Sequence, residues 1–161
     1  MCIRDRINEC PSCISLKDLL VQLEIEYTPD MEACGIHFGV QNVSEDIYIY
    51  GSMRKLQLLF ENLLYNAMSF TPAEGTIRIQ AQASDEFVRL SVWDTGCGIS
   101  KEDLPKIFER FYTKRKNGSG LGLYIVKTIV QEMGGSIQAT SNIKEGTVFT
   151  MKLPLYKNRE K

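Results

Sequence analysis

The sequence predicts an α/β fold of two layers, in which a mixed β-sheet packs on about three helices. Two observations support this class. Predicted helices carry apolar residues every three or four positions, and predicted strands alternate apolar and polar residues. These segments succeed one another as helix, strands, helix, hairpin, helices and strand pair. This order is typical of an α/β two-layer sandwich and not of repeated strand–helix–strand units.

The first predicted helix runs from Ser15 to about Glu26. Ser15 suits the N-cap position, because its hydroxyl can accept a hydrogen bond from a free backbone N–H group. The apolar face consists of Leu16, Leu19, Leu20 and Leu23. Pro29 and Gly35 are expected to bound a second, separate helical turn.

Two further helices are predicted, from Ser52 to about Phe70 and over residues 121–133. Pro72 ends the first of these, because proline cannot continue a helix, and the glycine pair at 134–135 ends the second. The apolar positions of the helix at 52–70 are Met53, Leu56, Phe60, Leu63, Ala67 and Phe70. Their spacing predicts one buried face.

Six short segments are predicted to be strands. They are residues 36–40, 47–50, 76–82, 87–93, 136–141 and 147–153. The third and fourth form a hairpin around a turn at residues 84–86, and a short acidic helix start comes after it at 100–103. The inward residues of the hairpin are Ile77, Ile79, Ala81, Val88, Leu90 and Val92.

Length and charge limit the class of protein. The 161 residues point to one domain, expected over residues 15–155, between tails at 1–14 and 156–161. Residues 1–6 join poorly to the rest of the chain, and a start that is not native is one interpretation of them. The 19 basic and 20 acidic residues leave a net charge of −1, which argues against binding to nucleic acid or to a membrane surface. Because no apolar run approaches the ~20 residues that span a bilayer, a soluble, cytoplasmic domain is expected.

The number and spacing of the cysteine and histidine residues exclude several kinds of site. The five cysteines lack a framework spacing and are expected to be reduced thiols. Cys10 and Cys13 form one CxxC pair, but a structural zinc site needs four ligands and no second pair occurs at a suitable spacing. The single histidine, His37, lies in a short apolar strand without an acidic neighbour. It is expected to be structural, and chemistry that needs two histidines is excluded.

The glycines are unevenly distributed, since seven of the 12 fall between Gly96 and Gly135. Such crowding predicts backbone close to a ligand, above all to phosphate groups. Gly118, Gly120 and Gly122 precede a helix, so that backbone N–H groups and the helix dipole could hold a polyphosphate there. A flexible loop with a helix cap is the alternative. The segment does not fit a Walker P-loop, which ends in Gly-Lys-Ser/Thr.

Asp94 comes after the inward positions of the second hairpin strand. A carboxylate at the end of an apolar face is costly unless it receives hydrogen bonds. Asp94 is therefore interpreted either as a turn-forming residue or as an acceptor for the amino group of adenine. In the second case, Gly96 and Gly98 would allow the ring to approach closely.

A polar stripe runs along the helix at 52–70, where Asn62, Asn66 and Ser69 lie at positions i, i+4 and i+7. Asparagine is a poor residue for the middle of a helix, so the stripe suggests a purpose. Either these side chains face solvent, or Asn66 supplies an amide oxygen to Mg²⁺, an ion that prefers oxygen ligands.

Together these segments resemble the ATP-binding catalytic domain of sensor histidine kinases, which shares a superfamily with DNA gyrase, the Hsp90 chaperones and MutL. The matching segments are residues 61–67 (ENLLYNA, asparagine box), 94–99 (DTGCGI, first glycine box), 107–112 (IFERFY, phenylalanine box), 118–123 (GSGLGL, second glycine box) and 145–147 (EGT, last glycine turn). The match covers about residues 15–154, and the resemblance implies a Bergerat-type ATP-binding fold.

The resemblance also implies a site for ATP and Mg²⁺. It assigns adenine to Asp94 and Mg²⁺ to Asn66, and it makes residues 113–119 a lid over the phosphates. The residues expected to contact ATP are Asn62, Asn66, Phe70, Asp94, Gly96, Gly98, Ile99, Tyr112, Lys114, Arg115, Gly118, Gly120, Leu121, Gly122 and Thr147.

The chain departs from this pattern at the end of the asparagine box, where many relatives have Lys and Tyr. Here Ser69 removes a cation aimed at the phosphates, and Phe70 keeps the ring but lacks the hydroxyl. Charge-assisted hydrogen bonds are about twice as strong as neutral ones, so the lost charge matters. We expect Lys114, Arg115 or Lys116 to replace it.

The resemblance implies a protein-histidine kinase fragment that donates the γ-phosphate of Mg-ATP to a histidine on a separate dimerisation domain. A response regulator would receive the phosphate next, and the parent kinase could be anchored in a membrane that this domain does not touch. Two alternatives remain open: a nucleotide-binding regulatory module without transfer activity, and a serine kinase of the anti-sigma-factor type.

Overall fold

The computed structural model describes residues 12–41, 43–44, 46–113 and 120–156. The strands are β1 (Ser12–Ser15), β2 (His37–Val40), β3 (Tyr48–Gly51), β4 (Thr76–Ala83), β5 (Phe87–Asp94), β6 (Ser136–Asn142) and β7 (Gly146–Pro154). The helices are α2 (Leu16–Ala33), α3 (Met53–Phe70), the short 3₁₀ helix η1 (Leu104–Lys106) and α4 (Gly122–Glu132). No helix among the described residues combines the length and the apolar character that crossing a membrane requires.

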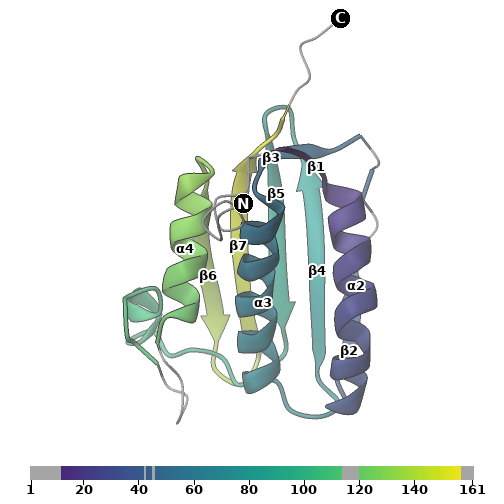
Figure 1. Ribbon diagram of the computed structural model, residues 1–161. Helices are drawn as coiled ribbons and strands as arrows, with labels where there is room; N and C mark the ends of the chain where they lie inside the picture. The colour runs from purple at the N-terminus through teal and green to yellow at the C-terminus, as the bar shows by residue number, and fades with distance from the viewer. Residues whose placement is uncertain (1–11, 42, 45, 114–119, 157–161) are drawn as a thin grey trace, which may run out of the picture.

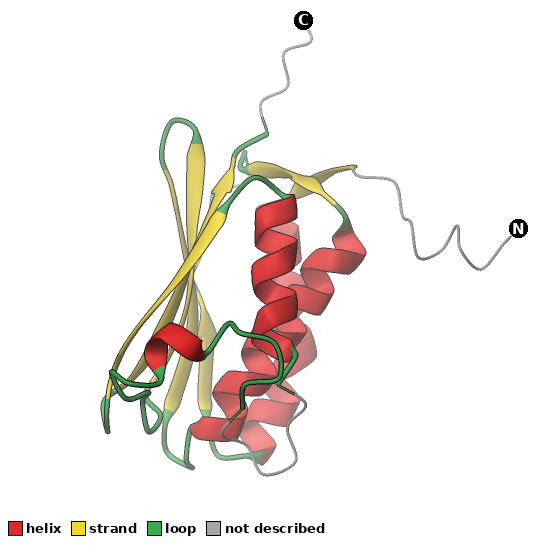
Figure 2. Cartoon of the chain, turned by 90° about the vertical axis from the view of Figure 1, so that its left-hand side faces the viewer, coloured by secondary structure: helices red, strands yellow, loops and turns green. Residues whose placement is uncertain are grey.

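The predicted sandwich is confirmed. Five strands form one sheet in the order β2-β4-β5-β7-β6, and α2, α3 and α4 all cover the same face of it (Figures 1 and 2). The sheet is mixed, because β2 runs parallel to β4 while the other neighbours are antiparallel. The core between the layers includes Phe60 and Leu63 of α3, Val92 of β5, and Phe149 and Met151 of β7.

The hairpin alternation is also confirmed, since every predicted inward residue of β4 and β5 is buried. Asp94 is the last residue of β5 and continues the inward series, with 4% of its surface exposed. Its register partners are Ile77 on β4 and Thr147 on β7. The strand pattern alone therefore places this carboxylate at the end of the apolar layer.

The start of α2 was predicted correctly, whereas its end was not. Ser15 is the N-cap, and its hydroxyl accepts a hydrogen bond from the backbone N–H of Asp18. The helix then continues through Pro29 to Ala33 instead of breaking into a separate turn. Proline removes only one helical hydrogen bond, and Pro29 is exposed, so that solvent can reach the carbonyl left without a partner. Thr28 also bonds back to the carbonyl of Glu24.

A second sheet was not predicted. β1 pairs with β3 in antiparallel register, Ser12 opposite Gly51 and Ser15 opposite Tyr48. Ile14 of β1 is buried in the core with 2% exposure. The strand therefore lies within the stretch that the sequence suggested was an N-terminal tail up to residue 14.

The two remaining helices bring three segments to one end of the sandwich. α3 begins at the N-cap Ser52 and ends at Phe70, close to its predicted bounds. After α4 comes Gly134 with a φ of 80°, and Gly135 donates back to the carbonyl of Val130. The end of α3, the end of β5 and the start of α4 all lie at the lower end of Figure 1.

Candidate functional site

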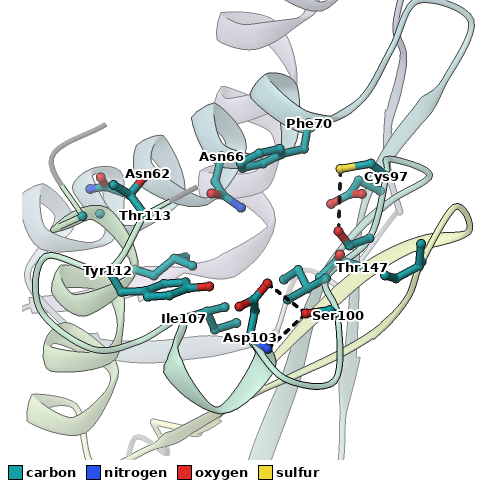
Figure 3. A pocket seen from close by; sticks show the side chains of 17 residues that line it. Asn62, Asn66, Phe70, Cys97, Ser100, Asp103, Ile107, Tyr112, Thr113 and Thr147 are labelled. Carbon is teal, nitrogen blue, oxygen red and sulfur yellow. Dashed lines mark hydrogen bonds between the residues drawn. The ribbon is translucent and has the colours of Figure 1, made fainter. Parts of the chain in front are cut away.

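A cavity of about 310 Å³ opens at this end of the molecule, between α3, α4 and the loops after β5. It collects residues from distant parts of the sequence (Figure 3). Ten of the predicted site residues line it: Asn62, Asn66, Phe70, Asp94, Gly98, Ile99, Tyr112, Gly120, Gly122 and Thr147. Gly96 and Leu121 were also predicted but do not line it. Lys114, Arg115, Lys116 and Gly118 lie outside the described residues.

Asp94 is the buried charged group of this cavity. Its Oδ1 atom accepts a hydrogen bond of 2.8 Å from the backbone N–H of Gly96. Burial raises the pKa of the Asp94 carboxyl above its ordinary 3.8, and hydrogen bonds from the backbone of Gly96 and Thr147 oppose part of that shift. The backbone thus holds the carboxylate in one orientation, at the floor of a mainly apolar cavity.

The glycines beside Asp94 lie close to the backbone of other chain segments. A Cβ atom on Gly96 would lie 2.5 Å from the carbonyl oxygen of Phe70. A Cβ atom on Gly98, which has a φ of 80°, would lie 2.2 Å from the carbonyl oxygen of Asn142. At both positions the nearest atoms are protein backbone. These two glycines let three chain segments pack together, and because Gly98 also lines the cavity, their role beside a ligand stays a prediction.

The polar stripe on α3 divides into three different environments. The amide of Asn62 donates a 2.8 Å hydrogen bond to the carbonyl of Leu58, and Ser69 donates likewise to Tyr65. Ser69 is exposed and does not line the cavity. Asn66 lines it, and its amide makes no hydrogen bond within the described part of the chain. Asn66 is therefore the stripe residue whose whole amide group remains available to a ligand.

Tyr112 and Asp103 line another wall of the cavity, where their side chains face each other (Figure 3). Desolvation and the nearby carboxylate of Asp103 raise the pKa of the Tyr112 phenol to about 12. The phenol therefore keeps its proton at neutral pH and can act as a hydrogen-bond donor. Asp103 is itself held by Ser100, through hydrogen bonds of 2.8 Å to its carboxylate and 3.1 Å from its backbone N–H.

The start of α4 forms the third wall. Gly120 has a φ of 73°, and a Cβ atom there would lie 2.3 Å from the carbonyl carbon of Phe111. The backbone N–H of Phe111 donates a 2.7 Å hydrogen bond to the carbonyl of Gly120, which ties these two segments together. Among the described residues no side chain caps the N-terminus of α4, so that its positive dipole end faces the cavity beside Gly122.

Six lining residues were missed: Cys97, Ser100, Asp103, Ile107, Leu123 and Ile143, whereas Thr113 belongs to the predicted lid. Several adjoin predicted residues, and sequence proximity could have suggested them. Ile143 has no such signal, because it lies in the turn between β6 and β7. Its neighbour Lys144 donates a 2.7 Å hydrogen bond to the carbonyl of Cys97, and this contact brings the turn to the cavity.

Side chains that could bind a metal do not cluster in the part of the chain that the structure describes. Within the described residues, no three His, Cys, Asp or Glu side chains come close enough to hold a metal ion. Cys13 is an exposed free thiol, and Cys10 lies outside the described residues. A Mg²⁺ ion that arrives with a phosphate ligand needs few protein ligands, and the amide oxygen of Asn66 fits that requirement. His37 is exposed at the start of the edge strand β2 and does not line the cavity.

Comparison with known proteins agrees with this geometry. Residues 51–157 match the family described as histidine kinase-, DNA gyrase B-, and HSP90-like ATPase. The sensor protein SrrB of Staphylococcus aureus (strain MRSA252) is 34% identical over 142 residues, which are 84% of this chain and 24% of SrrB. This chain therefore spans about a quarter of that relative.

Solved structures give the same result. The catalytic domain of the histidine kinase ThkA has a TM-score of 0.82 at 28% identity, covering 91% of this chain and 96% of that one. ThkA has also been solved in complex with the response regulator protein TrrA. Full-length ShkA in complex with AMPPNP has a TM-score of 0.82 at 30% identity, covering 93% of this chain and 32% of ShkA. The chain thus belongs to the family of histidine kinase-, DNA gyrase B- and HSP90-like ATPases.

Proposed function

We propose that this chain is the Mg-ATP-binding catalytic domain of a sensor histidine kinase. In this proposal it donates the γ-phosphate to a histidine on a separate dimerisation domain. The observation that carries the proposal is the cavity that Asp94, Asn66, Tyr112 and the start of α4 share. The resemblance to ThkA and ShkA catalytic regions, at 28% and 30% identity, favours a histidine kinase over other members of the family.

Adenine would bind at the Asp94 end of the cavity. One carboxylate oxygen of Asp94 accepts a hydrogen bond from Gly96, and the carboxylate has further lone pairs for an exocyclic amino group. Phe70 and Ile99 line the same cavity and supply apolar surface for a flat ring. A buried acceptor rejects bases that present another acceptor there, because two acceptors without a proton between them cost free energy.

The phosphates would lie toward α4. The N-terminus of α4 lies beside Gly120 and Gly122, and a helix N-terminus presents backbone N–H groups and a positive dipole end. Asn66 would hold Mg²⁺ through its amide oxygen, and the ion would neutralise charge on the phosphates when bound. Phosphoryl transfer depends mainly on positioning and charge neutralisation. The residues that bind ATP and Mg²⁺ would therefore also be the ones that promote the transfer.

The lid is proposed to supply the cation that Ser69 lacks. Ser69 is exposed and bonded to its own helix, so nothing at that position replaces the missing charge. Lys114, Arg115 and Lys116 remain the candidates from the sequence. We expect replacement of all three by Ala to weaken binding of an ATP analogue at least tenfold, and unchanged affinity would contradict this part of the proposal.

Transfer is tested by mixing the chain with the histidine-bearing hairpin of its parent kinase and γ-labelled ATP. Acid-labile phosphate on the hairpin is the expected result, and a response regulator added afterwards should remove it. Tight ATP binding without transfer would favour the regulatory module. Acid-stable phosphate on a serine of a partner protein would favour the anti-sigma-factor type of kinase.

The Asn66→Ala variant tests the proposed Mg²⁺ site. It removes the proposed Mg²⁺ ligand, and we expect it to lower the transfer rate at least tenfold. Alanine is a better helix former than asparagine, so α3 should not be weakened by the change. Thermal unfolding of the variant checks this, because a lost signal with an unchanged Tm cannot be due to unfolding.

A further inference from the structure

The five-stranded sheet has one face that no described element covers. All three long helices lie on the other side, as Figure 2 shows. Along β4, β5 and most of β7, the side chains that point away from the helices alternate with the buried ones. Most of these outward residues are polar or charged.

Charge is segregated on this open face. Its outward strand positions carry the cations Arg78, Arg89 and Lys152 and, within these five described strands, neither Asp nor Glu. The acidic residues that flank the strands, Asp85 and Glu86 among them, lie in turns. In a chain with 20 acidic and 19 basic residues, this distribution makes one cationic surface on a nearly neutral protein.

Two of the three cations oppose each other directly. Arg89 on β5 is the register partner of Lys152 on β7. Like charges at paired positions of a sheet destabilise it, and no carboxylate on the described strands of this face offsets the repulsion. The ammonium of Lys152 lies 5.0 Å from the ring centre of Phe87, and the guanidinium of Arg78 lies 5.5 Å from that of Trp93. Arg89 has no ion-pair or aromatic partner among the described residues.

Arg89 also lines a hollow of about 280 Å³ on this face. Its other polar lining side chains are uncharged amides and a hydroxyl, from Gln41, Gln80, Gln82 and Ser91. Glutamine offers both hydrogen-bond donors and an acceptor, which suits the N–H and C=O groups of a polypeptide backbone. The guanidinium of arginine suits a carboxylate, to which it can donate two parallel hydrogen bonds.

We propose that the open face of the sheet binds an acidic segment of a partner protein, with a carboxylate seated over Arg89 and Lys152. The carboxylate relieves the repulsion between these two cations, and the glutamines bind the backbone of the segment. Nucleic acid fits less well, because three cations on a chain of net charge −1 neutralise few phosphates. This proposal does not depend on nucleotide binding.

The test is a titration of the isotope-labelled 161-residue chain, free of nucleotide, followed by amide NMR shifts. The probes are an octapeptide of glutamate, an octapeptide of glutamine and an eight-nucleotide oligo-dT. We expect the glutamate peptide alone to shift the resonances of β4, β5 and β7. Its affinity should fall about tenfold in Arg89→Gln and again as salt is raised, because exposed charge pairs are screened.

Arg54→Gln on α3 is the matched control, since it removes the same charge from the helical layer. It should leave the peptide affinity within twofold of the unaltered chain. The Tm of Arg89→Gln should be equal or higher, because the variant loses a like-charge pair. Equal losses in both variants, equal binding of the glutamine peptide, tighter binding of oligo-dT or no shift at all would each overturn the proposal.

Discussion

The surroundings of Asp94 disfavour the charged form of its side chain. Burial raises the pKa of this carboxyl more than the backbone hydrogen bonds from Gly96 and Thr147 lower it, so the net shift is upward. A buried group kept at such a cost is typical of a functional site. The same residue therefore links the stability of the fold to the chemistry of the cavity.

Replacing Asp94 by Asn should raise stability and lower nucleotide affinity. A raised pKa means that the folded chain keeps this proton to a higher pH than the unfolded chain, whose value is near 3.8. The free energy of unfolding should therefore fall as the pH rises from about 4 through the raised pKa, and this fall should be smaller in Asp94→Asn. The amide oxygen can still accept the hydrogen bond from Gly96.

Urea unfolding at several pH values measures the first effect, and calorimetric titration with an ATP analogue measures the second. We expect the affinity to fall at least tenfold, or about 1.4 kcal/mol, because an amide group replaces the acceptor. A variant that is less stable than the unaltered chain at pH 7 and binds nucleotide equally well would show that Asp94 is only a turn residue.

Replacement by alanine should affect stability differently at Gly98 and at Gly39. Gly98→Ala should lower the free energy of unfolding by about 2 kcal/mol, because the new Cβ meets the carbonyl of Asn142 at a φ of 80°. At Gly39 a Cβ has no neighbour within 4 Å. Gly39→Ala should be neutral or raise stability by up to about 1 kcal/mol. Chemical denaturation of both variants checks this pair, and equal effects would contradict it.

Among the secondary-structure elements, helix starts could be predicted better than helix ends. Ser15 and Ser52 each cap a helix, because their hydroxyl oxygens accept hydrogen bonds from the backbone N–H groups of Asp18 and Lys55 respectively. Such bonds depend on residues three positions apart, which the sequence shows directly. The end of α2 depends on packing, because Met31 beyond Pro29 is fully buried and its burial favours continuing the helix.

β1 should contribute to stability although it was not predicted. A chain that starts at residue 16 should unfold more easily than one that starts at residue 12, because it loses the pairing with β3, the burial of Ile14 and the N-cap hydrogen bond of Ser15. Burying an isoleucine side chain is worth about 2 kcal/mol. Thermal unfolding of the two chains tests this, and equal Tm values would place the domain start after β1.

At the scale of the whole molecule, the cavity and the histidine are separate. His37 begins the edge strand β2 and is not among the residues that line the cavity. An isolated chain incubated with labelled ATP should therefore leave His37 unlabelled. His37→Gln should transfer phosphate to a histidine-bearing hairpin at the unaltered rate. Acid-labile label on the isolated chain that disappears in the variant would refute this expectation.

Much of the fold could be predicted because its signals are local. The alternation in β4 and β5 and the apolar stripe of α3 both appear in the sequence and in the buried residues of the structure. β1 was missed because four residues carry too little periodicity to be distinguished from a tail. In the site, Asp94 stood out as a polar residue at the end of an apolar pattern, and Asn66 stood out as an asparagine in the middle of a helix.

Periodicity sufficed to predict the two-layer sandwich and the inward direction of Asp94, since both depend on residues close together along the chain. The order of five motifs sufficed to identify the family resemblance. The tertiary structure was needed to show that Asn66 and not Ser69 reaches the cavity, and that Gly98 makes room for the turn of Asn142. It was also needed to show that Lys144 in the turn after β6 bonds to Cys97 and that Arg89 lies opposite Lys152. Each of these depends on contacts between segments far apart in sequence, which no local pattern encodes.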